Sequence, residues 1–243
     1  MKAKRWDFIF CLHLFALAWC CLPGCFLRCL GRFVPVVFAS RQDAGQRLAH
    51  RIRQVGVRAD VVLGLPRGGV VVASEVAHVL GLPLDVLIVR KIGHPLHREF
   101  AVGALAEGEV VVLDDAVIGT NPIVRSELEQ VIAEEKQRLE NYEGRFHREP
   151  RLNLENKAVL LVDDGLATGA TTEAAVRSAR EQGASLITVA APVASTSAVE
   201  RLAKVADAVV ALLEDPEFDA VGRYYDTFAQ TTDEEVLGLL KAA

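Results

Sequence analysis

The chain has 243 residues, of which 51% are hydrophobic and 24% charged, and its formal net charge at pH 7 is −5. A chain of this length and apolar content can bury one core together with a small additional unit. The negative net charge argues against a general nucleic-acid binder, because such proteins usually present a basic face. We therefore expect a globular protein with small-molecule partners and no nucleic acid.

Residues 1–36 differ in composition from residues 37–243, and we treat the two as separate units. The stretch 8–27 contains no Asp, Glu, Lys or Arg and is long enough to span a bilayer. Three interpretations stay open: a membrane anchor with the body facing the cytoplasm, an export signal, or a translated extension that is not native. Any membrane contact is expected through residues 8–27 alone.

The cysteines indicate the compartment of the body. All five lie within the first 29 residues, and residues 37–243 contain none. A secreted domain held by disulfides would distribute cysteines through its fold. We therefore expect a cytoplasmic body.

The body alternates between helical and strand patterns. Residues 41–54 have apolar positions at helical spacing behind Ser40, which is a good N-cap. We expect strands at 59–65, 84–89, 109–113, 158–163, 185–194 and 207–214, and helices at 70–80, 123–143, 169–182, 196–204 and the C-terminus. Residues 93–108 are expected as a loop with a hairpin-like return. This alternation predicts an α/β fold with a mainly parallel sheet, helices on both faces and a helical insertion at 123–147.

The segment VLLVDDGLATGATTEAA, residues 159–175, leads from a predicted strand into a predicted helix. Glycines allow close approach to a ligand, and the free amides at a helix start favour an anion. Thr168, Thr171 and Thr172 add hydroxyl donors. The loop lacks the lysine of the common nucleotide-binding GxxxxGK[ST] loop, so a phosphate monoester is the expected ligand.

Two adjacent carboxylates, Asp163 and Asp164, precede this loop. Carboxylates repel phosphate but accept hydrogen bonds from neutral hydroxyls. A sugar with vicinal hydroxyls and a phosphate suits both features, and a 5-phosphoribosyl group has both.

These residues resemble the type I phosphoribosyltransferase family. VLLVDDGLATGAT resembles its phosphoribosyl-pyrophosphate signature, with Gly165 in place of the more usual aliphatic residue. GLPRGG (64–69) resembles its pyrophosphate loop, and Arg90 and Lys91 lead into what would be its mobile catalytic loop. The resemblance covers about residues 40–230, and FDAVGRYYDTF is similar to a bacterial phosphoribosyltransferase-domain group without a defined acceptor.

The resemblance implies a small hood over the sheet, Mg²⁺ bound chiefly through the donor, and a strained peptide, cis in form, between Pro66 and Arg67. It also implies that no side chain ligates the metal directly and that Asp163 and Asp164 contact Mg²⁺ through water. The implied catalytic residues are Lys91, Arg67, Asp163 and Asp164. The implied substrate-binding residues are Gly165, Leu166, Ala167, Thr168, Gly169, Ala170, Thr171, Arg67, Gly68, Gly69 and Arg90.

Other features have ordinary alternatives. Lys91 is either a leaving-group contact or a solvated lysine at a strand end. Asp114 and Asp115 also end a strand, but no Gly/Thr loop follows, so they are interpreted as an ordinary strand end. His94 and His97 are interpreted as exposed loop residues in preference to a metal pair. Four hood aromatics, at positions 218, 224, 225 and 228, either stack on a nucleobase or close the core.

The resulting functional expectation is transfer of a 5-phosphoribosyl group from phosphoribosyl pyrophosphate to an unidentified acceptor, a nitrogenous base, with release of pyrophosphate. The alternative is a non-catalytic regulatory module that senses the donor. A receiver-type phosphoacceptor fits less well, because the acid pair lies late in the domain. The sequence leaves the acceptor undefined and a homodimer open.

Overall fold

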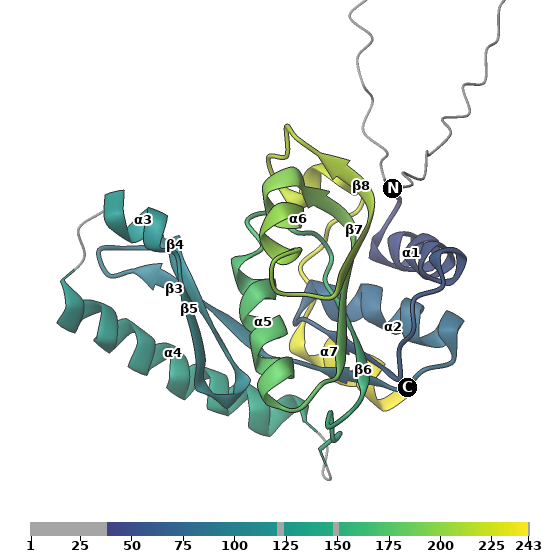
Figure 1. Cartoon of the computed structure of the whole chain (residues 1–243), viewed down its shortest axis with the longest axis horizontal. Coiled ribbons are helices and arrows are strands. Elements are labelled where there is room, and N and C mark those ends of the chain that lie inside the picture. Colours follow the sequence, from purple (N-terminus) through teal and green to yellow (C-terminus); the bar gives the residue numbers. More distant parts are fainter. Residues whose placement is uncertain (1–37, 121–123, 148–150, 243) are drawn as a thin grey trace, which may run out of the picture. The chain divides into compact units, whose positions relative to one another are not determined.

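Five parallel strands form the centre of the body (Figure 1). The structure is a computed structural model that describes residues 38–120, 124–147 and 151–242. In spatial order the strands are β2 (Leu84–Val86), β1 (Val61–Gly64), β6 (Ala158–Val162), β7 (Leu186–Ser195) and β8 (Ala208–Asp215). The fold is the predicted mainly parallel α/β sheet. The predicted boundary after residue 36 and the apolar stretch 8–27 lie outside the described residues.

Alternating side chains of the central strands fill two cores, because successive residues of a strand point to opposite faces. Val62 and Leu160 pack with α1 (Arg41–Val55) and α2 (Gly68–Leu80) on one face. Leu63 and Leu161 pack on the other face with α5 (Ala170–Glu181) and α6 (Thr196–Leu202). Helices cover both faces, as the alternation predicts.

The described termini of α1 follow the sequence signals. Ser40 has an extended backbone, and its hydroxyl accepts from the amide of Asp43 at 3.3 Å. Gly56 closes the helix in the left-handed region at φ 69°, where glycine has no steric penalty. The predicted cap and helix are confirmed.

A separate antiparallel sheet extends from the central one. It comprises β3 (Val89–His94), β4 (His97–Ala106) and β5 (Val110–Leu113), with the 3₁₀ turn η1 (Glu107–Glu109) between the last two. Helices α3 (Asp115–Thr120) and α4 (Arg125–Phe146) follow, and Ile92, Val102 and Leu105 share a core with α4. We call residues 89–146 the arm.

Two predictions in this region need correction. The expected strand 84–89 divides at Leu87 and Ile88, because β2 pairs with β1 whereas β3 pairs with β4. Both residues stay buried, so hydrophobicity alone carries no sign of the change of partner.

The expected loop with a hairpin-like return, 93–108, is right in the return, which is the β3–β4 hairpin, but wrong in the loop, because most of the segment is strand. The first residues after the turn, 97–100, are exposed and lack a two-residue apolar period, so the strand had no sequence signal there.

Residues from the start of the described body and from the segment after β8 pack together near the carboxyl ends of the central strands. Phe38 is fully buried, its amide donates to the carbonyl of Tyr224 at 2.7 Å, and it forms a parallel bridge with Tyr225. The 3₁₀ turn η2 (Val221–Tyr224) and helix α7 (Asp233–Ala242) follow β8. We call residues 38–41 and 216–230 the hood.

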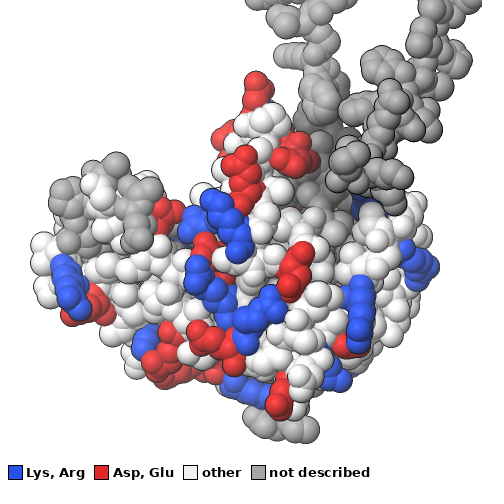
Figure 2. Space-filling view, in the orientation of Figure 1, with Lys and Arg blue, Asp and Glu red and all other residues white. Residues whose placement is uncertain are grey.

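On the face drawn in Figure 2, acidic and basic side chains are interspersed, and neither sign forms a broad field. Within the described part of the chain, no helix has the length and hydrophobicity needed to cross a membrane.

Candidate functional site

The two predicted anion loops follow neighbouring strands at the point where the strand order reverses. β1 leads to β2 on one side, whereas β6 leads to β7 on the other. Ligands of open α/β sheets bind beyond the carboxyl ends of the strands at such a switch point. Residues 65–69 follow β1 and residues 163–169 follow β6, so the topology brings both predicted loops together.

The two loops touch at glycines. A Cβ atom on Gly68 would lie 2.0 Å from Oδ2 of Asp164, and one on Gly69 would lie 2.8 Å from Oδ1 of Asp163. Any larger residue would displace the acid pair, so both glycines are required by close packing. The peptide between Pro66 and Arg67 is cis, in agreement with the expectation.

Neighbouring groups reduce the negative charge of the acid pair. Nε of Arg41 lies 2.7 Å from Oδ2 of Asp164, and the Tyr225 hydroxyl donates to the Asp164 carbonyl at 2.5 Å. The pKa of Asp163 is raised well above its ordinary value, first by burial of its carboxyl group and second by the negative charge of Asp164. The site entrance therefore has less negative charge than two free carboxylates would give.

The loop from Gly165 to Thr171 is fixed by hydrogen bonds with β7. The amide of Leu166 donates to the carbonyl of Val193 at 2.9 Å, and the Ser195 hydroxyl donates to the carbonyl of Ala167 at 2.5 Å. The Leu166 side chain is buried, so only its backbone could contact a ligand held by the loop. Gly165, the departure from the family pattern, lies where a Cβ would meet Val221 of the hood at 2.6 Å.

The start of α5 has the geometry of an anion site. Gly169 is its N-cap in the left-handed region at φ 73°, and Ala170 and Thr171 begin the helix. The Thr168 hydroxyl accepts from the Ala170 amide at 3.4 Å. Helix-start amides and a nearby hydroxyl together favour a phosphate.

A cavity of about 530 Å³ lies beside the loop, and one of about 430 Å³ lies beside Arg41 and the end of the hood. The larger is lined by Thr168, hydroxyl residues 195–197, Glu200 and the hood residues Phe218 and Asp219. Its mixture of hydroxyls, one aromatic ring and two carboxylates suits a polar small molecule.

The hood aromatics have different environments. Tyr224 and Tyr225 are buried and close the core. Phe218 stacks on Tyr224 with ring centroids 5.4 Å apart. The guanidinium carbon of Arg41 lies 3.8 Å from the ring centroid of Phe228.

Arg67 is the N-cap of α2 and points toward the last helix. Its Nη1 lies 3.7 Å from Oδ1 of Asp233, and the other oxygen of Asp233 lies 2.7 Å from Nη1 of Arg145 in α4. Asp233 therefore joins the predicted pyrophosphate loop to the arm.

Arg90 and Lys91 belong to the arm, where each has a partner. Nε of Arg90 lies 3.0 Å from Oε2 of Glu135, and Nζ of Lys91 donates to the carbonyl of Glu99 at 2.9 Å. Both line a cavity of about 550 Å³ between the hairpin and α4. Their predicted roles remain predictions, because the structure brings together the two loops but pairs these cations within the arm.

The alternative candidates also have defined surroundings. Asp114 is more than a simple strand end, because its carboxylate lies 2.9 Å from Nη1 of Arg201. His94 was expected to be exposed but is buried, and its Nδ1 accepts from the amide of Leu96 at 3.1 Å. Among the described residues, no group of three or more His, Cys, Asp or Glu side chains could hold a metal.

Sequence reasoning missed Arg41 and Asp233 as partners of the loops and Arg201 as a partner of Glu173, and it considered Tyr225 only as an aromatic candidate. Arg41 is separated from Asp164 by 123 positions, and no local pattern distinguishes it from other charged residues of α1. Its place immediately after the N-cap was the only available signal.

Two glycine-bearing loops meet at the switch point of a parallel sheet with an acid pair between them, an arrangement that suits a phosphate ligand. Residues 39–220 match the model of the phosphoribosyl transferase domain, and the chain belongs to that family.

Individual relatives agree with the assignment. The chain is 44% identical over 208 residues to a Mycobacterium tuberculosis (strain H37Rv) protein whose name places it provisionally among the phosphoribosyl transferases. The matched region is 85% of this chain and 47% of the relative, so the chain spans about half the length of that protein. The crystal structure of TT1426 from Thermus thermophilus is 45% identical, with a TM-score of 0.68, covering 84% of this chain and 97% of that one.

Proposed function

We propose that the chain transfers a 5-phosphoribosyl group from phosphoribosyl pyrophosphate to a small-molecule acceptor, a nitrogenous base, and releases pyrophosphate. The observation that carries the proposal is the contact of the two loops, with Gly68 and Gly69 against Asp164 and Asp163. One loop suits a diphosphate and the other a 5-phosphate, and the carboxylates between them suit ribose hydroxyls.

The chemistry required of the protein is mainly charge neutralisation and positioning. Positive charge develops on the ribose as pyrophosphate leaves, so groups that stabilise the departing diphosphate lower the barrier. In this proposal Arg67, with the amides of Gly68 and Gly69, holds the diphosphate. Arg90 and Lys91 approach it from the arm, and the loop 165–171 holds the 5-phosphate.

Mg²⁺ would neutralise the diphosphate when bound with the donor. Adjacent carboxylate oxygens at positions 163 and 164 are ligands of the type that Mg²⁺ prefers, and Mg²⁺ commonly keeps several waters. In this proposal the acid pair contacts the ion through water.

The test is incubation of the full chain with phosphoribosyl pyrophosphate, Mg²⁺ and a panel of nitrogenous bases, with measurement of pyrophosphate and of ribosylated products. We expect acceptor-dependent pyrophosphate release and a product heavier by one phosphoribosyl group. Donor binding in calorimetry without turnover on any base would instead favour the sensing module. Absence of donor binding would refute both.

A further inference from the structure

A carboxylate lies unexpectedly close to the predicted phosphate loop. Glu173 is in the first turn of α5, and its amide donates to the carbonyl of Gly169 at 2.8 Å. The residue is 7% exposed. A buried negative charge at this helix end would repel a phosphate unless positive groups neutralise it.

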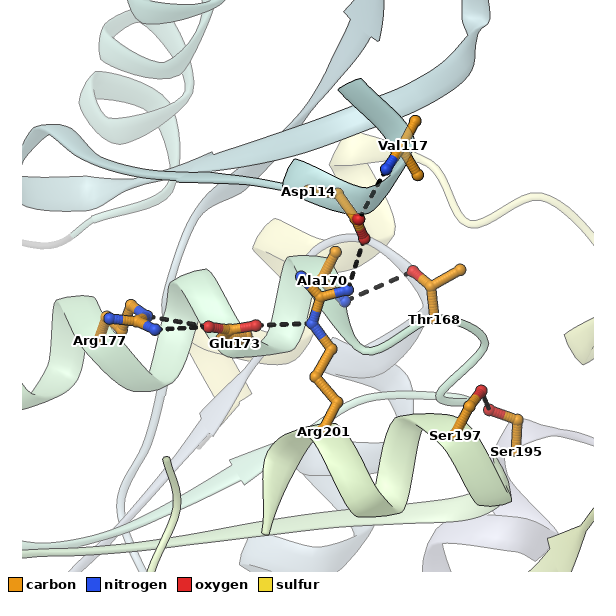
Figure 3. A network of polar contacts seen from close by, with 9 residues as sticks. All are labelled: Asp114, Val117, Thr168, Ala170, Glu173, Arg177, Ser195, Ser197 and Arg201. Atoms are coloured by element: carbon orange, nitrogen blue, oxygen red, sulfur yellow. Dashed lines mark hydrogen bonds and ion pairs between the residues drawn. The ribbon is translucent and has the colours of Figure 1, made fainter. Parts of the chain in front are cut away.

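Two arginines supply that neutralisation, as Figure 3 shows. Arg177 approaches Oε1 of Glu173 with Nε at 3.0 Å and Nη2 at 2.7 Å, and Nε of Arg201 lies 2.6 Å from Oε2. Burial alone would raise the pKa of Glu173, but the hydrogen bonds from Arg201 and Arg177 outweigh it and lower the pKa. The carboxylate is therefore charged and compensated.

Arg201 also reaches the arm. Its Nη1 lies 2.9 Å from Oδ2 of Asp114, which directly follows β5. Asp114 is itself fixed in the arm, because its amide donates to the carbonyl of Val102 at 2.9 Å and its Oδ1 accepts from the amide of Val117 at 3.2 Å. One guanidinium thus bridges α5 of the body and β5 of the arm.

The arm transmits this contact to Lys91 through its strand pairing. Lys91 is paired with Ala104, and Ala104 is paired with Val112, two residues before Asp114. The base of the arm has a second link to α5, since the buried hydroxyl of Ser178 donates to the carbonyl of Glu107 at 2.7 Å. Hydrogen-bonded strands move together, so the Asp114 contact bears on the position of Lys91.

We propose that Arg201 is a positioning residue that holds the arm, and with it Lys91, in a fixed relation to the phosphate loop. The inference rests on the proposed function. The two contacts of Arg201 have separable consequences: the contact with Glu173 supports donor binding, and the contact with Asp114 supports the chemical step.

The test compares kcat, KM for the donor, and donor affinity by calorimetry, in full-length variants. Asp114→Asn retains an oxygen for the Val117 amide but loses the charge that attracts Arg201. We expect its kcat to fall about tenfold or more, with KM for the donor changed less than about twofold, because misplacement of a reacting group affects chemistry more than binding. Arg177→Gln should raise KM, and Arg201→Gln should both lower kcat and raise KM.

Asp207→Asn is the matched control. It removes the same charge from an ion pair of α5, with Arg180 at 2.7 Å, outside the loop and the arm. Its kcat and KM should match those of the wild type. Arg201→Lys keeps one positive charge without the forked geometry, so it should restore donor affinity but not kcat.

The inference is overturned if Asp114→Asn has wild-type kcat. It is also overturned if Asp114→Asn raises KM for the donor as much as Arg201→Gln does. A loss of folding in both variants, seen as a lowered Tm that parallels the loss of kcat, would also overturn it. Failure of the proposed function is a different result, namely a wild-type chain that neither binds the donor nor releases pyrophosphate.

Discussion

At the scale of single residues, the site depends on charges that compensate one another. Arg41 offsets Asp164, and burial favours the protonated form of Asp163. An anionic donor can then approach two acids without strong repulsion, while their oxygens remain available for hydroxyl groups.

Replacing both acids tests this interpretation. Asp163→Asn/Asp164→Asn should weaken phosphoribosyl-pyrophosphate binding about tenfold or more, since Asp164 alone would lose charged hydrogen bonds to the ribose hydroxyls, and each such bond contributes about 1.5–3 kcal/mol. Binding of inorganic phosphate should stay unchanged, because phosphate has no ribose hydroxyls. Calorimetry with each ligand decides it. Equal weakening of both would mean that the acids only maintain the shape of the loop.

At the scale of elements, the transition from loop to helix at α5 forms the anion site. The left-handed Gly169 and the hydroxyl of Thr168 stand immediately before the first helical amides. β-Branched side chains are strained in the left-handed region and would fill the space that a phosphate needs.

The double change Thr168→Val/Gly169→Val should therefore abolish donor binding in calorimetry. Gly183→Val is the matched control, because Gly183 also has a positive φ, of 89°, but lies beyond the opposite end of α5. This control should lower Tm through the same backbone strain while donor affinity persists. Undiminished affinity in the double variant would remove the phosphate role of the loop.

The end of α4 is attached through His147. Its Nε2 lies 2.8 Å from Oε1 of Glu107, and its Nδ1 lies 3.7 Å from Oδ1 of Asp85 in β2. Burial lowers the pKa of His147, but the hydrogen bond with Glu107 and the negative charges of Asp85 and Glu107 outweigh burial and raise the pKa to about 9. The protonated ring thus joins the arm to the central sheet.

The free energy of unfolding should therefore fall as the pH becomes alkaline. The folded pKa is above the ordinary 6.5, so the contribution of His147 is fully present below pH 6.5 and is lost as pH rises through about 9. In urea unfolding, the stability advantage of the wild type over His147→Gln should shrink between pH 7 and pH 10. The exposed His50, changed to Gln, serves as the control and should show no such trend. A constant advantage across this range would contradict the assigned interaction.

At the scale of the whole molecule, the described body begins with Phe38, whose ring and backbone are part of the hood. Since Phe38 shares a core with Tyr224 and Tyr225 of the same body, we expect residues 37–243 to fold without residues 1–36.

Deletion of residues 1–36 should leave a folded protein with undiminished donor affinity and an unchanged Tm. Deletion of residues 1–39 removes Phe38 and should lower stability by about 3–5 kcal/mol, the usual cost of losing a buried phenylalanine. Unfolding curves and calorimetry of both truncations make the comparison. Cells that contain the full chain can also be fractionated. Recovery of a processed body outside the cytoplasm would refute the cytoplasmic location expected from the sequence.

The sequence by itself determined the elements of the central sheet and the positions of the two loops, but not the strands of the arm hairpin. Local signals sufficed for the cap at Ser40, for the strands of the parallel sheet and for the Gly/Thr segment after β6, because capping, periodicity and glycine content act within a few residues. The family resemblance agreed with the cis peptide at Pro66–Arg67 and with the domain match.

Only the tertiary structure decided which residues those loops contact. Arg41 reaches Asp164, Arg201 joins Glu173 to Asp114, and a continuous apolar run divides between two sheets at Leu87 and Ile88. Each of these depends on residues far apart in the chain, and a side chain has the same local sequence signal whether or not a distant partner meets it. Strand pairing and helix packing bring those partners together, so the charge balance of the site exists only in the folded chain.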